Sequence, residues 1–518
     1  MHKLIRWLRL MPALAGVLAL ASCAVNPVTG QAQLSLIPES QEIAIGNQQY
    51  EPSQQAQGGL YTVDPELSKY VSVVGQRVAQ HSDRKLPYQF VVLNNSVPNA
   101  WCLPGGKIAV NRGLLMALDN EAELAAVLGH EITHAAAKHG VSAMQRGMLL
   151  NGLVQATQIS AQNSRYAGLT NVIVGGAQLG AQLVNQKFSR GDELQADHYG
   201  TIYMSRAGYD PQAAVTLQEK FVKLSEGNNP SWLDGLFASH PPSEERVKAN
   251  EKTVSELPKG GELGRERYRK ELAYLESRKK AYADFDHAVT LAAHDQDTPA
   301  MADVDHAIAI EPKEPRFYGL KGDILRQEKR YTLATEQYNH ALQLDSHYYE
   351  YYLGRGLARS KLGRTQLARV DLEYSNKLLP TAVATQELGQ LALASGNVPA
   401  AKQYFQTAMT ASGAVGKQAE AAFVKLDVTD NPTRYIAAQP AIAQDGKFIA
   451  TLTNTTSLAL EGVDVQFSAT VNGQPVTRTL RVNNMVPGQQ GTVFSGWQFG
   501  PSDQVSDARA VVTAVKLK

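Results

Sequence analysis

The sequence predicts a multidomain, mainly helical fold that consists of an α+β domain, an α-solenoid of repeats and a C-terminal immunoglobulin-like β-sandwich. Three observations support this prediction. The chain has 518 residues, which is enough for about three domains. Similar segments begin at Ala307 and Ala341, a spacing of 34 residues that is typical of paired-helix repeats. Short runs of alternating apolar and polar residues begin near residue 428.

Residues 1–23 have the pattern of a targeting signal. Basic residues precede an apolar stretch from Leu10 to Ala21, which is too short to cross a bilayer comfortably. The stretch ends in Leu-Ala-Ser-Cys23, which resembles the bacterial lipobox, whose cysteine is acylated and becomes the first residue of the mature chain. We therefore expect a lipoprotein signal peptide with the lipid anchor on Cys23; an ordinary signal peptide with a chance cysteine is the alternative. Because Ala24 and not Asp follows, the resemblance implies a periplasmic protein held to the outer membrane.

An α+β domain is expected at residues 38–275, after a tether at 24–37 that is rich in Gln, Ser, Gly and Pro. Asn120 and Glu123 have the spacing of a capping box, so a helix should begin there and stop at Gly140. The remaining expected elements are helices at 38–50, 65–82 and 191–207, strands at 88–93, 100–103 and 107–110, an amphipathic helix packed over the site within 141–187, and a closing helical tail.

Residues 281–426 are expected to form about four tetratricopeptide repeats and a closing helix. Small residues such as Gly322, Ala334 and Ala341 recur where paired helices must approach closely. A non-repeating helical bundle is the alternative. Residues 428–518 are rich in Thr, Val, Gly and Asn, and turn signals such as Asn472-Gly473 separate their alternating runs, which predicts the β-sandwich.

Charge and cysteine content exclude several classes of protein. The chain has 50 basic and 49 acidic residues, so it lacks the basic excess of a nucleic-acid-binding protein. If Cys23 is lipidated, Cys102 has no partner in the chain, and disulfides do not hold the fold together. Cys102 is then best interpreted as a small buried residue.

His130-Glu131-Ile132-Thr133-His134 is the motif that predicts the chemistry. Residues four apart lie on one face of a helix, so both imidazoles can reach one Zn²⁺ ion. Glu131 beside them can take a proton from water bound to the metal. A catalytic zinc site needs three protein ligands and one open position.

Glu193 is the candidate for the third ligand. The position six residues after His134 is Gly140, which excludes a histidine ligand there, and His139 should point away from the metal, about 140° round the helix. Glu193 opens a second helix, with Asp197 four residues later on the same face, where it can accept the free ring N–H of a ligand histidine. A plain amphipathic helix with acidic residues in its first turn is the alternative.

These pieces together resemble the HtpX-like, CAAX-prenyl-protease-type family of gluzincin zinc metallopeptidases over roughly residues 35–275. The resemblance rests on Asn99-Ala100 with Pro104-Gly105-Gly106, the motif at 130–134, Ser189-Arg190 with the helix of Glu193, and His240-Pro241 with Arg246. The lipobox and the repeats resemble the periplasmic, BepA-like members, which act in outer-membrane protein quality control. The β-sandwich is not part of that pattern.

The resemblance implies hydrolysis of peptide bonds with one Zn²⁺ per chain, in unfolded or misassembled proteins, and contact with the outer-membrane assembly machinery through the repeats. Glu131 would be the general base. His240 would stabilise the oxyanion or occupy the open zinc position, or it is simply a surface residue, and Arg246 would orient Glu193 or Asp197. Residues 100–103 are expected to be an edge strand that pairs with an extended peptide.

Two functions from other classes remain open. The protein could be mainly a chaperone or scaffold for outer-membrane protein assembly with little turnover, although such a scaffold need not retain an intact His-Glu-x-x-His motif. A cell-wall or carbohydrate enzyme has only the β-sandwich in its favour.

Overall fold

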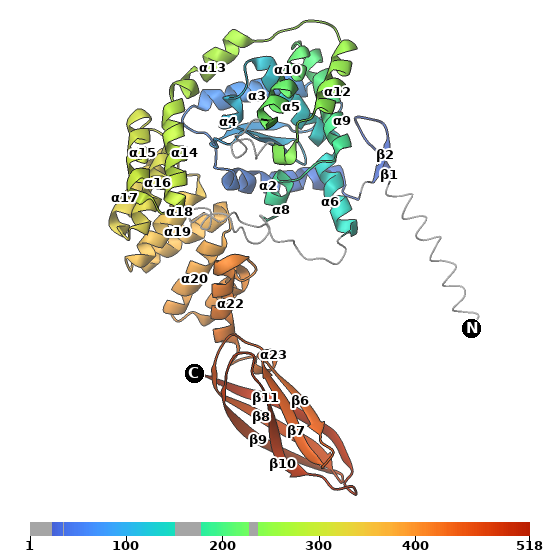
Figure 1. The fold of residues 1–518 in the computed structure, drawn as a ribbon, viewed down its shortest axis with the longest axis vertical. Helices are drawn as coiled ribbons and strands as arrows, with labels where there is room; N and C mark the ends of the chain where they lie inside the picture. The colour runs from blue at the N-terminus through green and yellow to red at the C-terminus, as the bar shows by residue number, and fades with distance from the viewer. Residues whose placement is uncertain (1–22, 35, 151–177, 227–236) are drawn as a thin grey trace, which may run out of the picture. The chain divides into compact units, whose positions relative to one another are not determined.

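A computed structural model describes residues 23–34, 36–150, 178–226 and 237–518 (Figure 1). Residues 1–22 of the expected signal peptide lie outside these residues, as do residues 151–177 of the stretch in which the amphipathic helix was expected. The chain forms two compact units, Met1–Pro380 and Thr381–Lys518.

A small mixed sheet organises the first unit. Its strand order is β3-β5-β4, with β3 (Gln89–Leu93) parallel and β4 (Ala100–Leu103) antiparallel to the central β5 (Lys107–Asn111). Each of the five residues of β5 is buried, which explains why its three central residues, 108–110, are all apolar and do not alternate with polar ones. Among the described strands, β4 pairs with β5 alone and is an edge strand, as predicted.

Helices pack around this sheet and continue into the second half of the unit. The predicted helix at 65–82 is α3 (Pro65–Ala79), whose apolar positions, at Leu67, Val71, Val74 and Val78, are at most 2% exposed. The other helices of this region are α2 (Glu39–Ala56), α4 (Arg112–Leu115), α5 (Glu121–Ala136), α6 (His139–Leu150), α8 (Gln178–Val184), α9 (Arg190–Arg206), α10 (Gln212–Glu226), α12 (Glu244–Ser255) and α13 (Arg265–Ser277).

The stretch expected to be a tether contains regular structure. β1 (Cys23–Val25) pairs with β2 (Ala32–Leu34) in an antiparallel hairpin. The side-chain amide of the buried Asn26 donates a hydrogen bond of 3.2 Å to the carbonyl of Ala137, at the end of α5. The segment after Cys23 is therefore attached to the domain rather than free of it.

The expected end of the first catalytic helix at Gly140 is wrong. α5 ends at Ala136, Lys138 takes a left-handed conformation with φ 61°, and a new helix, α6, contains Gly140. A left-handed lysine costs roughly 1–2 kcal/mol. The ammonium group of Lys138 lies 3.7 Å from the buried carboxylate of Glu42, and this contact helps to hold the bend.

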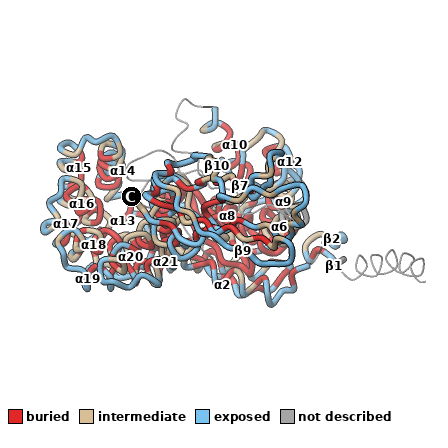
Figure 2. The backbone as a smooth tube through the Cα atoms, turned by 90° about the horizontal axis from the view of Figure 1, so that it is seen from below, coloured by how far each residue is buried: buried red, intermediate tan, exposed pale blue. Residues whose placement is uncertain are grey.

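The predicted repeats are helix pairs. In the first unit they are α14 (Lys279–Ala293) with α15 (Asp297–Ile310), α16 (Pro315–Gln327) with α17 (Tyr331–Leu344), and α18 (Tyr349–Lys361) with α19 (Thr365–Leu378). Buried and exposed residues alternate along these helices (Figure 2). One cluster of buried residues runs from Tyr61 through α3, the sheet and α5 to Ile324 in α16, so the domain around the sheet and the first repeat helices share a continuous core.

The second unit begins with α20 (Ala382–Ala394), α21 (Val398–Ala408) and α22 (Gly413–Asp427), which are the last predicted helix pair and the closing helix, and the short α23 (Pro432–Tyr435). Its strands are β6 (Ile436–Ile442), β7 (Lys447–Asn454), β8 (Leu460–Val471), β9 (Gln474–Met485), β10 (Gln490–Gln498) and β11 (Val505–Leu517).

These strands form two antiparallel sheets, in the orders β10-β7-β6 and β11-β8-β9. Their buried sides meet in one hydrophobic core, in which the rings of Phe448 and Phe467 lie 5.2 Å apart. β6 was not predicted, because Pro440 interrupts its pattern; proline is tolerated there since β6 is an edge strand.

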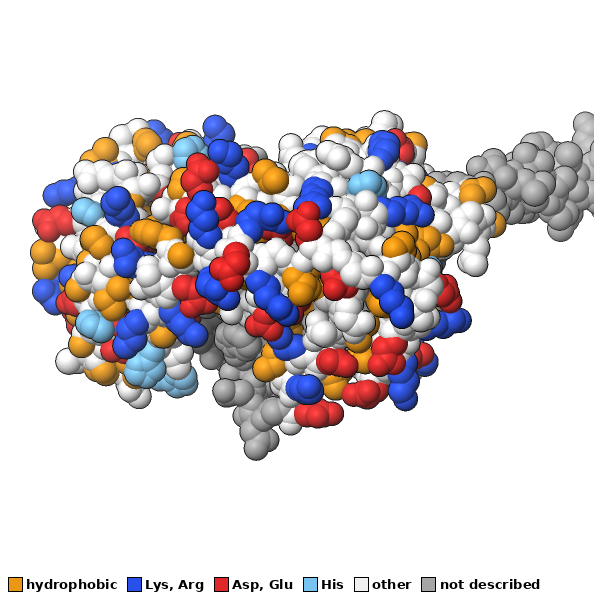
Figure 3. Space-filling view, turned by 90° about the horizontal axis from the view of Figure 1, so that it is seen from above, with side chains coloured by type: hydrophobic (Ala, Val, Ile, Leu, Met, Phe, Trp, Pro, Cys, Tyr) orange, Lys and Arg blue, Asp and Glu red, His pale blue; other side chains and the backbone are white. Residues whose placement is uncertain are grey.

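Charges of both signs are interspersed on the face in Figure 3, in line with the nearly neutral composition. Within the part of the chain that the structure describes, no helix combines the length and the apolar character needed to cross a membrane.

Candidate active site

The helices that carry the candidate metal ligands cross at two glycines. A Cβ atom on Gly129 of α5 would lie 2.6 Å from the carbonyl oxygen of Gly200 on α9, and one on Gly200 would lie 2.7 Å from the nitrogen of His130. Only residues without a side chain permit this approach. The crossing brings the first turn of α9, with Glu193, beside His130 and His134.

The side chains of His130, His134, Glu193 and His240 converge on one point. Each offers one ligand atom, and these atoms lie within 4.8 Å of one another. The Nε2 atoms of the first two are 2.9 Å apart, and they lie 3.5 Å and 3.4 Å from the carboxylate oxygens of Glu193. Tetrahedral zinc with bonds of about 2.1 Å separates its ligand atoms by roughly 3.4 Å, so this nitrogen and oxygen set fits zinc.

Asp197 and Arg246 orient His130. Nδ1 of His130 lies 2.9 Å from Oδ1 of Asp197, which accepts its proton and leaves Nε2 free to bind a metal. Arg246 donates to both oxygens of Asp197, at 2.6 Å and 2.7 Å. Burial raises the pKa of Asp197. The charge and hydrogen bonds of Arg246, together with the hydrogen bond from His130, have a larger opposite effect, so the net pKa is below its usual value.

His134 is oriented by a residue that was expected to point away from the metal. The bend at Lys138 turns the ring of His139 back, so that its Nδ1 lies 2.8 Å from Nδ1 of His134. His139 Nε2 donates to Oε1 of Gln195 at 2.7 Å, and its Nδ1 therefore accepts the proton of His134 Nδ1. Burial lowers the pKa of His134 well below 6.5, so its Nε2 lone pair stays available. His139 lies outside the ligand cluster, as predicted. The prediction assumed a continuous helix, however, and the helix ends at Ala136 and bends at Lys138.

Glu193 and His240 form a buried ion pair. Oε1 of Glu193 lies 2.9 Å from Nδ1 of His240, and its Oε2 lies 2.9 Å from Nη1 of Arg246. Burial raises the pKa of Glu193, but the nearby charge of His240 and the neighbouring histidine rings have a larger opposite effect, so the net pKa is well below its usual value. Glu193 is therefore a carboxylate, the form that binds a metal.

Glu131 is 2% exposed and lies beside this cluster. Its Oε1 is 3.7 Å from Nε2 of His240, and its Oε2 has no hydrogen-bond partner among the described residues.

Cys102 is not a thiolate nucleophile. Burial, and next the charge of Glu131, raise the pKa of its thiol well above the usual value.

The structure thus brings together the residues predicted at the site: His130, Glu131, His134, Glu193, Asp197, His240 and Arg246. The side chain of Cys23 lies outside the described part. Sequence reasoning missed Gln195 and Phe188, whose ring stacks on His134 with centroids 4.0 Å apart. Gln195 follows Glu193 by two residues, and no local pattern marks it.

Comparison with known proteins agrees with this geometry. Residues 65–254 match Peptidase family M48, and residues 315–348 match the tetratricopeptide repeat. The chain is 31% identical to the Beta-barrel assembly-enhancing protease of Yersinia pestis, over 38% of this chain and 41% of that protein. It is 33% identical to Mitochondrial metalloendopeptidase OMA1 of Arabidopsis thaliana, over 32% and 31%, and 34% identical to Metalloprotease LoiP of Escherichia coli (strain K12), over 31% and 61%.

The match spans about two fifths of the length of the assembly-enhancing proteases. The predicted resemblance to HtpX-like, BepA-like metallopeptidases is confirmed: the chain carries a peptidase domain of family M48 together with tetratricopeptide repeats.

Proposed function

We propose that this M48-domain protein is a zinc-dependent endopeptidase of the periplasm that degrades misfolded or stalled outer-membrane proteins. The observation that carries the proposed catalysis is the convergence of His130, His134 and Glu193, each buried and each held by its own hydrogen-bond or charge partner, with Glu131 beside them. The proposed location and substrates rest on the names of the assembly-enhancing proteases. A buried arrangement of this kind has no evident use in a protein that only binds.

Zinc bound by His130, His134 and Glu193 would supply Lewis acidity toward water and toward the scissile carbonyl. The chain's own residues do the rest. Asp197 and His139 fix the two imidazoles so that the Nε2 atom of each points into the ligand cluster, where it could bind the metal. Glu131 takes the proton of the attacking water and later passes it to the leaving amine.

His240 has two candidate roles, and its position favours one of them. Its Nδ1 lies 3.2 Å from Nε2 of His130 and 2.9 Å from Glu193, where a fourth ligand would stand. We therefore favour a role in which Nδ1 of His240, after losing its proton, would bind the metal at its open position, over a role at the oxyanion. β4 is the proposed edge strand for an extended substrate, since it pairs with β5 alone among the described strands.

We further propose that a lipid on Cys23 attaches the protein to the outer membrane and that the repeats contact the assembly machinery. For the domains we propose the limits 38–275, 281–426 and 428–518, with an immunoglobulin-like arrangement of the C-terminal strands. The names of the relatives in Yersinia pestis and Escherichia coli refer to β-barrel assembly and support the proposed contact with the assembly machinery. The proposed lipid anchor rests on the lipobox-like sequence that ends at Cys23.

Glu131→Gln tests the mechanism. The variant should keep about one zinc per chain by elemental analysis but lose cleavage of an unfolded test protein, because the ligands remain and the base is gone. His134→Ala should lose the zinc as well. Cleavage at the wild-type rate by Glu131→Gln would refute the mechanism. If Glu131→Gln loses cleavage in vitro yet fully restores outer-membrane assembly in a deletion strain, the scaffold function is favoured instead.

A further inference from the structure

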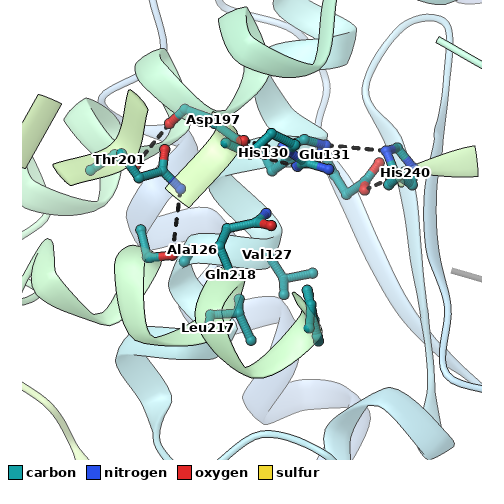
Figure 4. A pocket seen from close by; sticks show the side chains of 13 residues that line it. Ala126, Val127, His130, Glu131, Asp197, Thr201, Leu217, Gln218 and His240 are labelled. Carbon is teal, nitrogen blue, oxygen red and sulfur yellow. Dashed lines mark hydrogen bonds and ion pairs between the residues drawn. The ribbon is translucent and has the colours of Figure 1, made fainter. Parts of the chain in front are cut away.

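A cavity of about 40 Å³ borders the candidate active site and has no part in the mechanism above (Figure 4). His130, Glu131 and His240 form its border with the ligand cluster. Apolar side chains supply much of the remaining wall: Ala126 and Val127 of α5, and Ala214, Leu217 and Phe221 of α10.

Two buried amide side chains also line this cavity, Gln218 of α10 and Asn250 of α12. They are 6% and 2% exposed. Oε1 of Gln218 and Oδ1 of Asn250 have no hydrogen-bond partner among the described residues. The amide of Asn250 makes one long hydrogen bond, of 3.5 Å, to the carbonyl of Ala214. A buried acceptor without a partner costs about 1–3 kcal/mol, so two of them in one cavity suggest that a ligand supplies the missing donors.

We propose that this cavity is a specificity pocket that selects a compact, uncharged side chain with hydrogen-bond donors, and asparagine over leucine. This inference rests on the proposed peptidase function. The pocket should hold the side chain of the substrate residue directly after the scissile bond. Glu131 passes a proton to the amine of that residue, and Glu131 forms part of the pocket wall.

Size and charge define the preferred side chain. A volume of about 40 Å³ holds roughly three water-sized groups. Asparagine and leucine each carry three heavy atoms beyond Cβ, and only asparagine can donate to Gln218 and Asn250. A lysine or arginine would lose its hydration in a mostly apolar space, in which Asp197 is already paired with Arg246 and the carboxylate of Glu131 faces His240 and serves as the base.

The test uses full-length, zinc-loaded protein and two peptides that differ only by asparagine or leucine after the scissile bond. Wild type should prefer asparagine in kcat/KM by about 5- to 150-fold, the range expected when the alternative leaves buried acceptors unpaired. Gln218→Met, which keeps the size but removes the amide, should reduce this ratio several-fold, because one of the two acceptors is lost and that of Asn250 remains. Gln212→Met is the matched control, because Gln212 lies exposed on the same helix, and it should keep the wild-type ratio.

Binding separates failure of the pocket from failure of the proposed function. The same two peptides, made with a reduced and uncleavable bond, are titrated into wild type and Gln218→Met. Tighter binding of the asparagine peptide that depends on Gln218, without cleavage of any peptide, would refute the peptidase function and leave the pocket standing. Three results would overturn the pocket. Wild type could cleave both peptides with equal kcat/KM, it could prefer leucine, or Gln218→Met could leave the ratio unchanged.

Discussion

Gly200→Ala should weaken zinc binding although Gly200 is no ligand. Gly200 lies where α9 crosses α5, and an added Cβ would stand 2.7 Å from the backbone carbon of Gly129 and from the nitrogen of His130. Both neighbours are backbone atoms, so neither can rotate out of the way. The helices must separate instead, and α9 carries Glu193 and Asp197 away from the histidines of α5.

The size of the effect follows from the contact distance. Ordinary van der Waals contact begins at 3.4 Å, so the backbones must part by about 0.7 Å, the difference between 3.4 Å and 2.7 Å. Metal sites tolerate shifts of about 0.2 Å in their ligands. Overpacking costs typically 1–3 kcal/mol, and displaced supporting groups cost roughly 10- to 100-fold in metal affinity.

The assay is competition for zinc with a chelator, together with thermal unfolding of the metal-free protein. Gly200→Ala should release zinc at lower chelator concentration and unfold at lower temperature. Gly191→Ala on the same helix is the control, because its Cβ would meet nothing closer than 3.8 Å. If Gly200→Ala holds zinc as firmly as Gly191→Ala, the crossing does not determine the ligand geometry.

Two further predictions concern acid stability and anchoring. Burial raises the pKa of Glu121, but hydrogen bonds from Arg267, Tyr209 and Tyr70 have a larger opposite effect, so its pKa in the folded protein lies below 4.5. Glu121 therefore stabilises the fold above about pH 4.5, and this stabilisation is lost as the pH falls through the pKa of the folded state. Glu121→Gln should therefore flatten the acid limb of the unfolding free energy, and an unchanged limb would contradict this. Cys23→Ala should leave the chain outside the outer-membrane fraction, and wild-type fractionation would indicate another anchor.

Local sequence patterns predicted the elements that depend on local packing. The apolar face of α3 and the spacing of His130 and His134 are visible because residues on one helix face recur with the helical period. The turn of His139 toward His134 was not visible, because it depends on Lys138 in a left-handed conformation and on Glu42, which lies far away in the chain. The partners of a buried ligand can come from any element that packs against it.

The contact between the peptidase domain and the repeats was likewise invisible in the sequence, and it changes what a truncation should do. The change to a repeating pattern near residue 281 suggests a peptidase domain that folds without the repeats. In the structure, the guanidinium of the buried Arg112 lies 3.6 Å over the ring of Tyr282, and the amide of Asn94 donates to Glu314 at 2.8 Å. Tyr282 belongs to the core that continues to Ile324.

A chain ending at Lys280 would expose that core and leave Arg112 without its aromatic partner. We therefore expect it to be insoluble or to unfold at much lower temperature than full-length protein, whereas a chain ending at Pro380, which keeps the whole first unit, should fold and retain zinc. Circular dichroism and zinc analysis of the two truncations decide the matter. A stable, zinc-loaded and active chain ending at Lys280 would show that the buried contacts of Arg112 and Asn94 contribute little. If it fails as expected, the part that the repeats play in recruiting substrates must be tested by surface substitutions, because removing them would destroy the enzyme as well.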